Sequence, residues 1–262
     1  MMRAMWSAAA GMSVQQSNMD VISNNLANVN TTGYKKGRAE FQDLLYQTIN
    51  LAGTGSSTST NLPTGIQLGN GARLQAVARQ YTTGSLKNTG GKFDLAIEGD
   101  GFFNVTQADG TLAYTRDGAF TIDQNGLMVT SDGLTLNPQI TIPQDATSVT
   151  IATDGTVSVS ISGQSATTTL GQITISHFIN PAGLNTLGGN LVQPTTASGD
   201  AIEGIPGQDG LGSIRQGFLE SSNVDVAEEM VNMIIWQRAY EASSKSIETV
   251  DSMLQTVIAL KR

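Results

Sequence analysis

The two ends of this chain each carry a long amphipathic helical pattern, and this pattern limits the folds that the chain can adopt. Seam positions recur every three or four residues over residues 3–30 and again over residues 225–262. At 1.5 Å per residue, helices of about 26 and about 36 residues would be roughly 39 Å and 54 Å long, which exceeds the usual helix length in globular domains. Stripes of this length need a partner helix to cover them.

The expected helix ends are marked by local signals. Asp225 with Glu228 three residues later resembles a capping box at the start of the C-terminal helix. The N-terminal helix is expected to end in the polar tract at residues 28–33, where Asn and Gly tolerate a left-handed stop. Four asparagines lie within or beside this end of the helix although asparagine is a poor helix former, and we predict that they make hydrogen bonds between helices: Asn24, Asn25, Asn28 and Asn30.

The middle of the chain has a period of two, which predicts β structure. Short apolar runs from residue 93 onward lie between Asp-Gly and Asn-Gly pairs, which predict antiparallel strands joined by type I′ turns. Between the first helix and this region we expect a short helical patch at residues 41–49, a low-complexity linker at residues 54–60 and a strand at residues 74–82. The predicted fold class is α+β, with paired terminal coiled-coil-type helices and a central antiparallel β-rich domain.

Composition excludes several classes of function. The chain has 262 residues, a net charge of -8, no cysteine and one histidine. The acidic balance disfavours nucleic-acid and anionic-membrane partners, and the lack of cysteine excludes disulfides and thiolate chemistry. No run of 18 apolar residues predicts a transmembrane helix, and the N-terminus does not read as a cleaved signal peptide. We therefore expect no membrane insertion, and export, if it occurs, by another route.

Catalytic and metal-binding interpretations are weak. The intervals between the Asp-Gly pairs drift, so they indicate turns rather than a repeated calcium site. Asp94 and Glu98 could form an acid pair of a wall hydrolase, but spacing alone does not predict the required separation. We expect no enzyme activity, no cofactor and no metal. Lys35, Lys36 and Arg38 are either a solvated basic patch or a contact to an acidic neighbour.

Residues 20–36 resemble the N-terminal signature of the bacterial flagellar rod and hook axial proteins, and further stretches carry the same resemblance at residues 40–49, 62–69, 97–103, 222–234 and 237–241. Within that family the likeness is strongest to the distal rod subunits. The segment at residues 50–73 is similar to the one that distinguishes the straight rod from the bent hook, and the chain has no room for the larger inserted domain of hook proteins. Residues 146–171 are generic Ser/Thr-rich sequence and carry no family contacts.

The resemblance implies a three-part architecture and a role in assembly. Terminal helices (1–30 with 225–262) would form an inner tube, residues 31–92 with 205–224 a connecting region, and residues 93–204 an outer β domain. Unfolded export and polymerisation into a hollow rod would follow, with the adjacent rod and hook proteins and the surrounding ring proteins as partners. The alternatives are a proximal rod or short hook-type protein, a secreted adhesin or a wall hydrolase.

From the seam positions and the resemblance together, we predict which residues pack between subunits. They are Met5, Met12, Met19, Ile22, Asn24, Asn25, Leu26, Asn28, Val29, Val226, Met230, Met233, Gln237, Tyr240, Ile247, Leu254 and Ile258. The residues predicted to stiffen the rod are Leu62, Pro63, Gly65, Ile66 and Leu68.

Overall fold

The chain folds into two compact units. The computed structural model describes residues 2–51, 55–57, 60–61, 64–161 and 166–260. Unit 1 comprises Met1–Leu26, Gly37–Ala78 and Asp225–Arg262, and unit 2 comprises Ala27–Lys36 and Arg79–Val224. Helices from both ends of the chain flank a central antiparallel β-rich region, which confirms the predicted α+β class.

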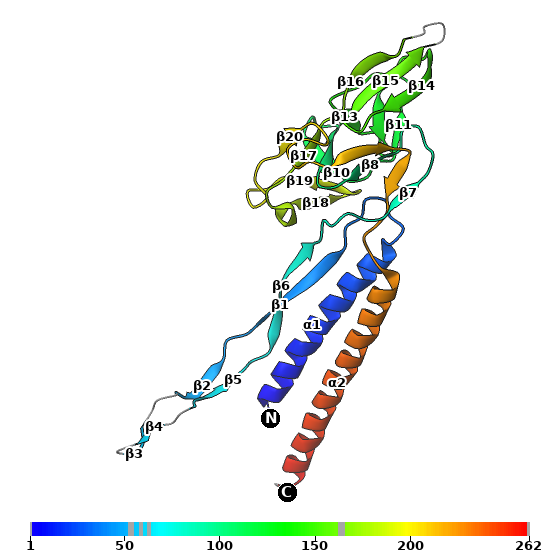
Figure 1. Ribbon diagram of the computed structural model, residues 1–262. Helices are drawn as coiled ribbons and strands as arrows, with labels where there is room; N and C mark the ends of the chain where they lie inside the picture. Colours follow the sequence, from blue (N-terminus) through cyan, green and yellow to red (C-terminus); the bar gives the residue numbers. More distant parts are fainter. Residues whose placement is uncertain (1, 52–54, 58–59, 62–63, 162–165, 261–262) are drawn as a thin grey trace. The chain divides into compact units, whose positions relative to one another are not determined.

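Unit 1 is built around the two terminal helices. They are α1 (Met2–Ala27) and α2 (Val226–Ala259), which run side by side in opposite directions (Figure 1). The side chain of Asp225 caps α2 by accepting hydrogen bonds from the backbone N–H groups of Ala227 and Glu228, so the predicted start is confirmed. Among the described residues, neither helix combines the length and apolar content needed to cross a membrane.

The predicted helical patch at residues 41–49 is wrong, because this segment is extended. It belongs to an arm of paired strands in unit 1, in which β1 pairs with β6, β2 with β5 and β3 with β4. A few apolar residues at helical spacing could not outweigh these long-range backbone pairings. The strands are β1 (Gly37–Asp43), β2 (Gln47–Asn50), β3 (Gly55–Ser57), β4 (Thr60–Asn61), β5 (Ile66–Leu68) and β6 (Ala72–Arg79).

The described residues of unit 2 form a nine-stranded antiparallel sheet, three smaller sheets and one 3-10 turn, η1 (Pro181–Gly183). The nine strands are β9 (Phe102–Thr106), β10 (Leu112–Thr115), β11 (Phe120–Ile122), β12 (Met128–Thr130), β13 (Thr135–Asn137), β17 (Ile175–His177), β18 (Asn185–Gly188), β19 (Leu191–Gln193) and β20 (Ile202–Gly204). The smaller sheets are formed by β7 (Leu86–Asn88), β8 (Leu95–Glu98), β14 (Ala146–Ile151), β15 (Thr156–Ile161), β16 (Thr168–Gln172), β21 (Ser213–Gln216) and β22 (Phe218–Glu220).

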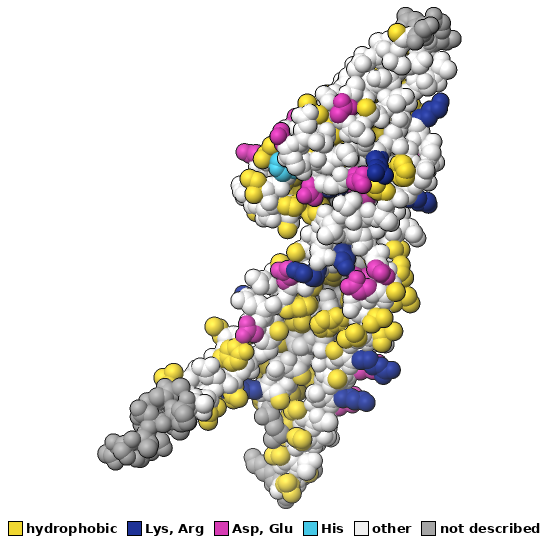
Figure 2. Space-filling view, viewed as in Figure 1, with side chains coloured by type: hydrophobic (Ala, Val, Ile, Leu, Met, Phe, Trp, Pro, Cys, Tyr) yellow, Lys and Arg dark blue, Asp and Glu magenta, His cyan; other side chains and the backbone are white. Residues whose placement is uncertain are grey.

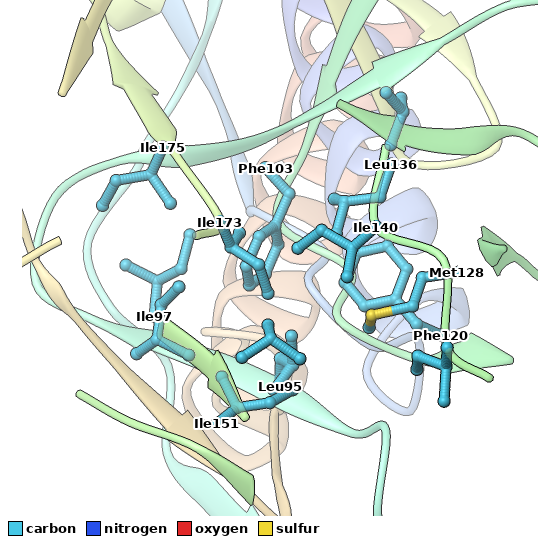
Figure 3. Close-up of a cluster of buried hydrophobic side chains, with 14 of the residues drawn as sticks. Leu95, Ile97, Phe103, Phe120, Met128, Leu136, Ile140, Ile151, Ile173 and Ile175 are labelled. Carbon is cyan, nitrogen blue, oxygen red and sulfur yellow. The ribbon is translucent and has the colours of Figure 1, made fainter. Parts of the chain in front are cut away.

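The main core of unit 2 lies between these sheets. Phe103 and Phe120 pack edge to face there, with ring centroids 5.2 Å apart (Figure 3). Because side chains alternate along a strand, Phe102 points to the opposite face of the sheet, into a second buried cluster with Tyr114 and Phe178. The central strand β9 is therefore buried on both faces, as its unbroken apolar start suggests.

Four of the six Asp-Gly or Asn-Gly pairs lie in hairpin loops, but the predicted turn type is wrong. In each loop the glycine alone has positive φ, for example 82° at Gly110 and 80° at Gly126, whereas a type I′ turn needs positive φ at both central residues. The Gly110 N–H donates to the carbonyl of Gln107, and the Gln107 N–H donates to that of Thr111. These bonds define three-residue loops, each a type I turn followed by a left-handed glycine.

Asp117-Gly118 has a different role from the hairpin pairs. The backbone of β8 passes so close to Gly118 that a Cβ atom there would lie 1.6 Å from the carbonyl oxygen of Leu95. The Leu95 N–H donates to the Gly118 carbonyl at 3.0 Å. Glycine is required here for the close approach of two backbones.

Candidate assembly surface

A row of large apolar side chains lies on the outward face of α2. Val231, Ile234 and Ile235 are 55%, 57% and 56% exposed, and Val226 and Met230 extend the row toward the start of the helix. Figure 2 shows hydrophobic side chains gathered along the helices of unit 1. Soluble monomers rarely expose a contiguous apolar surface of this kind, so this face has the character of an interface.

The opposite face of α2 packs within unit 1. The ring of Trp236 lies 6.1 Å from the ring of Phe41 on β1, and the amide of Gln15 on α1 donates to the Ser243 hydroxyl at 3.1 Å. Half-buried Met233 and Ile247 lie on this side too. The N-terminal half of α2 therefore carries apolar residues on both faces, one used inside the chain and one left open.

The predicted subunit-packing residues differ in exposure. The exposed ones are Asn24, Val226, Met230, Gln237, Tyr240 and Ile258. The half-buried ones are Met5, Met12, Met19, Leu26, Asn28, Val29, Met233, Ile247 and Leu254. The buried ones are Ile22 and Asn25. Their contacts with other subunits stay a prediction.

Asn25 already has partners within its own chain. Its amide nitrogen donates to the carbonyl of Gly37 at 2.9 Å, and its amide oxygen accepts from the N–H of Gly37 at 2.9 Å. The side chain thus mimics a paired strand and ties the last turns of α1 to the start of β1. For this asparagine, the intrachain bonds account for its burial without a neighbouring helix.

The predicted stiffening insert is only partly described. Leu62 and Pro63 lie outside the described residues, whereas Gly65, Ile66 and Leu68 lie at or on β5 and are exposed. The paired segment adds further exposed apolar side chains: Leu45, Ile49 and Leu51. This arm of unit 1 therefore carries a second exposed apolar surface. The sequence-based prediction of rod-stiffening residues included only the part of it at residues 62–68.

A buried ion cluster lies in unit 2. The Nζ of Lys35 is 2.5 Å from Oε1 of Glu220, and Nη1 of Arg116 is 3.4 Å from Oε2 of Glu220. All three side chains are 3% exposed or less. Burial lowers the pKa of Lys35 and of Arg116, and the carboxylate of Glu220 opposes both shifts.

The ion cluster decides between the two interpretations of the basic patch. Lys35 contacts an acidic neighbour, Glu220, which lies 185 residues away in the sequence. Arg38 forms an exposed pair with Glu40 at 2.8 Å, which is a solvated surface contact worth little. Neither Arg116 nor Glu220 stood out in the sequence, because an ion pair between distant residues leaves no local pattern.

The outward residues Val231, Ile234 and Ile235 were also missed from the predicted packing set. Their spacings of three and one residues beside the predicted seam are typical of a helix that is apolar over most of its circumference. The prediction included only one apolar stripe of this helix, so the second stripe was absent from it.

Three family descriptions match the chain. Residues 5–35 match the flagella basal body rod protein, residues 96–159 the flagellar hook protein FlgE/F/G D1 domain, and residues 215–260 the flagellar basal body rod FlgEFG protein C-terminal region. The three matched ranges together cover nearly all of both terminal helices and part of the central β region. They define the class as rod and hook axial proteins of the flagellum.

Full-length relatives narrow the class. The chain is 53% identical to the flagellar basal-body rod protein FlgG of Borreliella burgdorferi and 41% identical to that of Bacillus subtilis, with 100% of both chains covered in each case. It is 42% identical to the flagellar hook protein FlgE of Helicobacter mustelae, over 51% of this chain and 30% of the hook protein. The chain belongs to the flagellar basal-body rod protein family, and within it is most like the distal rod protein.

Proposed function

We propose that copies of this chain polymerise into the distal rod of the flagellar basal body, a hollow helical drive shaft that transmits torque from motor to hook. The observation that supports this most directly is the open apolar face of α2 at Val231, Ile234 and Ile235. An interface between different faces of identical subunits generates an open helical filament when its rotation does not close into a ring.

The assembled protein would have the three-part arrangement expected from the sequence. Residues 1–30 with 225–262 would form the inner tube, residues 31–92 with 205–224 the connection, and residues 93–204 the outer domain. Partners would be further copies of the chain, the adjacent rod and hook axial proteins and the surrounding ring proteins. The predicted packing residues on α1 and α2 would meet neighbouring helices.

The role is structural, with no catalysis and no cofactor. The rod would span the periplasm after export without a cleaved signal peptide. We propose further that α1 and α2 order fully only on addition to the growing end, which places the entropic cost of folding at the site of assembly and suppresses premature polymerisation.

Electron microscopy of the purified protein at increasing concentration tests the proposal. We expect hollow tubes, and we expect removal of α1 or of α2 to abolish them, since the two helices together would form the inner tube. A chain that stays monomeric at millimolar concentration would contradict the proposal. Retention of tubes without the helices would contradict it as well.

Other outcomes would favour the alternative functions. A peptidoglycan-cleaving or surface-binding activity unaffected by helix removal would favour the hydrolase or the adhesin. Incorporation at the base of the rod rather than next to the hook would favour the proximal rod.

The arm of unit 1 supplies a second prediction. Deleting residues 54–68 should permit export and polymerisation but give a rod that bends, because it removes exposed Ile66 and Leu68, which we expect to bridge neighbouring subunits. The measurement is curvature in electron micrographs. Replacing two exposed apolar residues of unit 2, Ile179 and Leu187, with glutamine is the control, and it should leave the rod straight. A straight, stiff rod from the deletion would refute the bridging role.

A further inference from the structure

The chain segment that follows α1 and the segment that precedes α2 are bonded directly to each other inside unit 2. The N–H of Gly33 donates to the carbonyl of Glu220 at 2.8 Å, and the N–H of Lys36 donates to Oδ1 of Asn223 at 2.7 Å. The Lys35–Glu220 ion pair lies between these two bonds. Residues 31–36 and 220–223 thus form two sides of one contact, which we call the junction.

A third segment, residues 80–84, completes the junction. The Gln80 N–H donates to the Lys36 carbonyl at 3.0 Å, and the Asn223 amide donates to the Gln80 carbonyl at 2.8 Å. Nζ of Lys35 donates to the Thr82 carbonyl at 2.7 Å, and the Gly84 N–H donates to Oε1 of Glu220 at 2.8 Å. The two buried charges of the junction, on Lys35 and Glu220, are therefore each held by groups from more than one segment.

The junction allows one arrangement. A Cβ atom at Gly84 would lie 2.0 Å from the Ser221 carbonyl oxygen, and one at Gly33 would lie 2.7 Å from the carbonyl carbon of Arg116, so backbones meet here at closest approach. A partly formed junction would leave a buried charge without its counter-ion, which is strongly unfavourable. The junction should therefore form completely or not at all.

We infer that the junction is folded in the unassembled subunit. It holds together the segment that follows α1 and the segment that precedes α2 before either helix orders. This inference rests on the proposed function. Because Ala27 and Val224 belong to unit 2, the junction fixes where both helices start to grow. A subunit arriving at the rod then needs to order two helices from neighbouring anchor points, not to find their pairing from a disordered chain.

Hydrogen exchange on the full-length unassembled monomer tests the inference. The amides of Gly33, Lys36 and Gly84 should be protected as strongly as core amides such as Leu95, while amides in the middle of α1 and α2 exchange at least tenfold faster. Junction amides that exchange as fast as the helices would overturn the inference, and so would helices protected as well as the junction. The monomer is read without any polymer, so failure to form tubes counts against the proposed function alone.

Two variants test the cause of the protection. Lys35→Met keeps the aliphatic stem and leaves Arg116 paired with Glu220, and Asn223→Ala removes the amide clamp without a change of charge. Each should lower protection at Gly33, Lys36 and Gly84 at least tenfold, leave Leu95 unchanged and slow polymerisation. The control is Lys87→Met, an exposed lysine of β7 in the same unit. Unchanged junction protection in both variants would overturn the inference.

Discussion

Replacing Glu220 with glutamine should destabilise unit 2 by about 3–5 kcal/mol, because it removes the only carboxylate that contacts the two buried cations among the described residues. Glutamine has nearly the same size and can still accept a hydrogen bond from the Gly84 N–H. The expected loss therefore reports the uncompensated charges of Lys35 and Arg116, not a cavity. Denaturant unfolding of unit 2, followed by the circular dichroism of its β-strands, measures the loss of stability.

A surface pair of the same chemistry is the matched control. Arg215 and Glu98 lie 2.7 Å apart in the same unit, but both side chains are about half exposed. Glu98→Gln should cost less than about 1 kcal/mol, since solvent screens the pair. If Glu220→Gln costs no more than Glu98→Gln, then the buried cluster does not hold unit 2 together, and its three charges must find other compensation.

Features with a local pattern could be predicted from the sequence. The helices were predictable because the three-to-four spacing continues over many turns, and Asp225 carries its capping partner in the adjacent residues. The strands of unit 2 were predictable because apolar runs alternate with turn pairs. The turn type was not, since an Asp-Gly pair fits either a two-residue loop or the three-residue loop observed at Gly110 and Gly126.

Features that depend on distant partners could not be predicted. Arg116 and Glu220 are 104 residues apart and meet only after the strands have paired. Phe41 was assigned to a helix because its long-range pairing through β1 leaves no trace in the neighbouring residues. Likewise, Gln216 accepts from the Ile151 N–H and donates to the Val149 carbonyl, so its side chain pairs with β14 as a strand would. An isolated glutamine gives no sign of this role.

Replacing Val231, Ile234 and Ile235 together with glutamine should raise the critical concentration for polymerisation about 30- to 1,000-fold. Full burial of such a side chain contributes about 1.5–3 kcal/mol, and each is slightly more than half exposed when α2 is folded, so contact with a neighbouring subunit can contribute roughly half of that from each. The three together give about 2–4 kcal/mol, which converts to this range. Glutamine is a good helix former, so α2 keeps its propensity to form.

The matched control replaces three exposed apolar residues of unit 2, Ile179, Leu187 and Ile202, with glutamine. These residues lie outside the terminal helices, so the critical concentration should change by less than about threefold, within the few tenths of a kcal/mol typical of surface substitutions. Sedimentation at graded concentrations gives both values, and electron microscopy checks that the pellet consists of tubes. An equal effect of the two triple variants would show that general surface hydrophobicity drives association. Each glutamine in the α2 variant removes apolar surface only from the outward side of the helix. A larger effect of this variant than of the control would therefore assign assembly to the outward face, and not to the face that Trp236 and Met233 use within the chain.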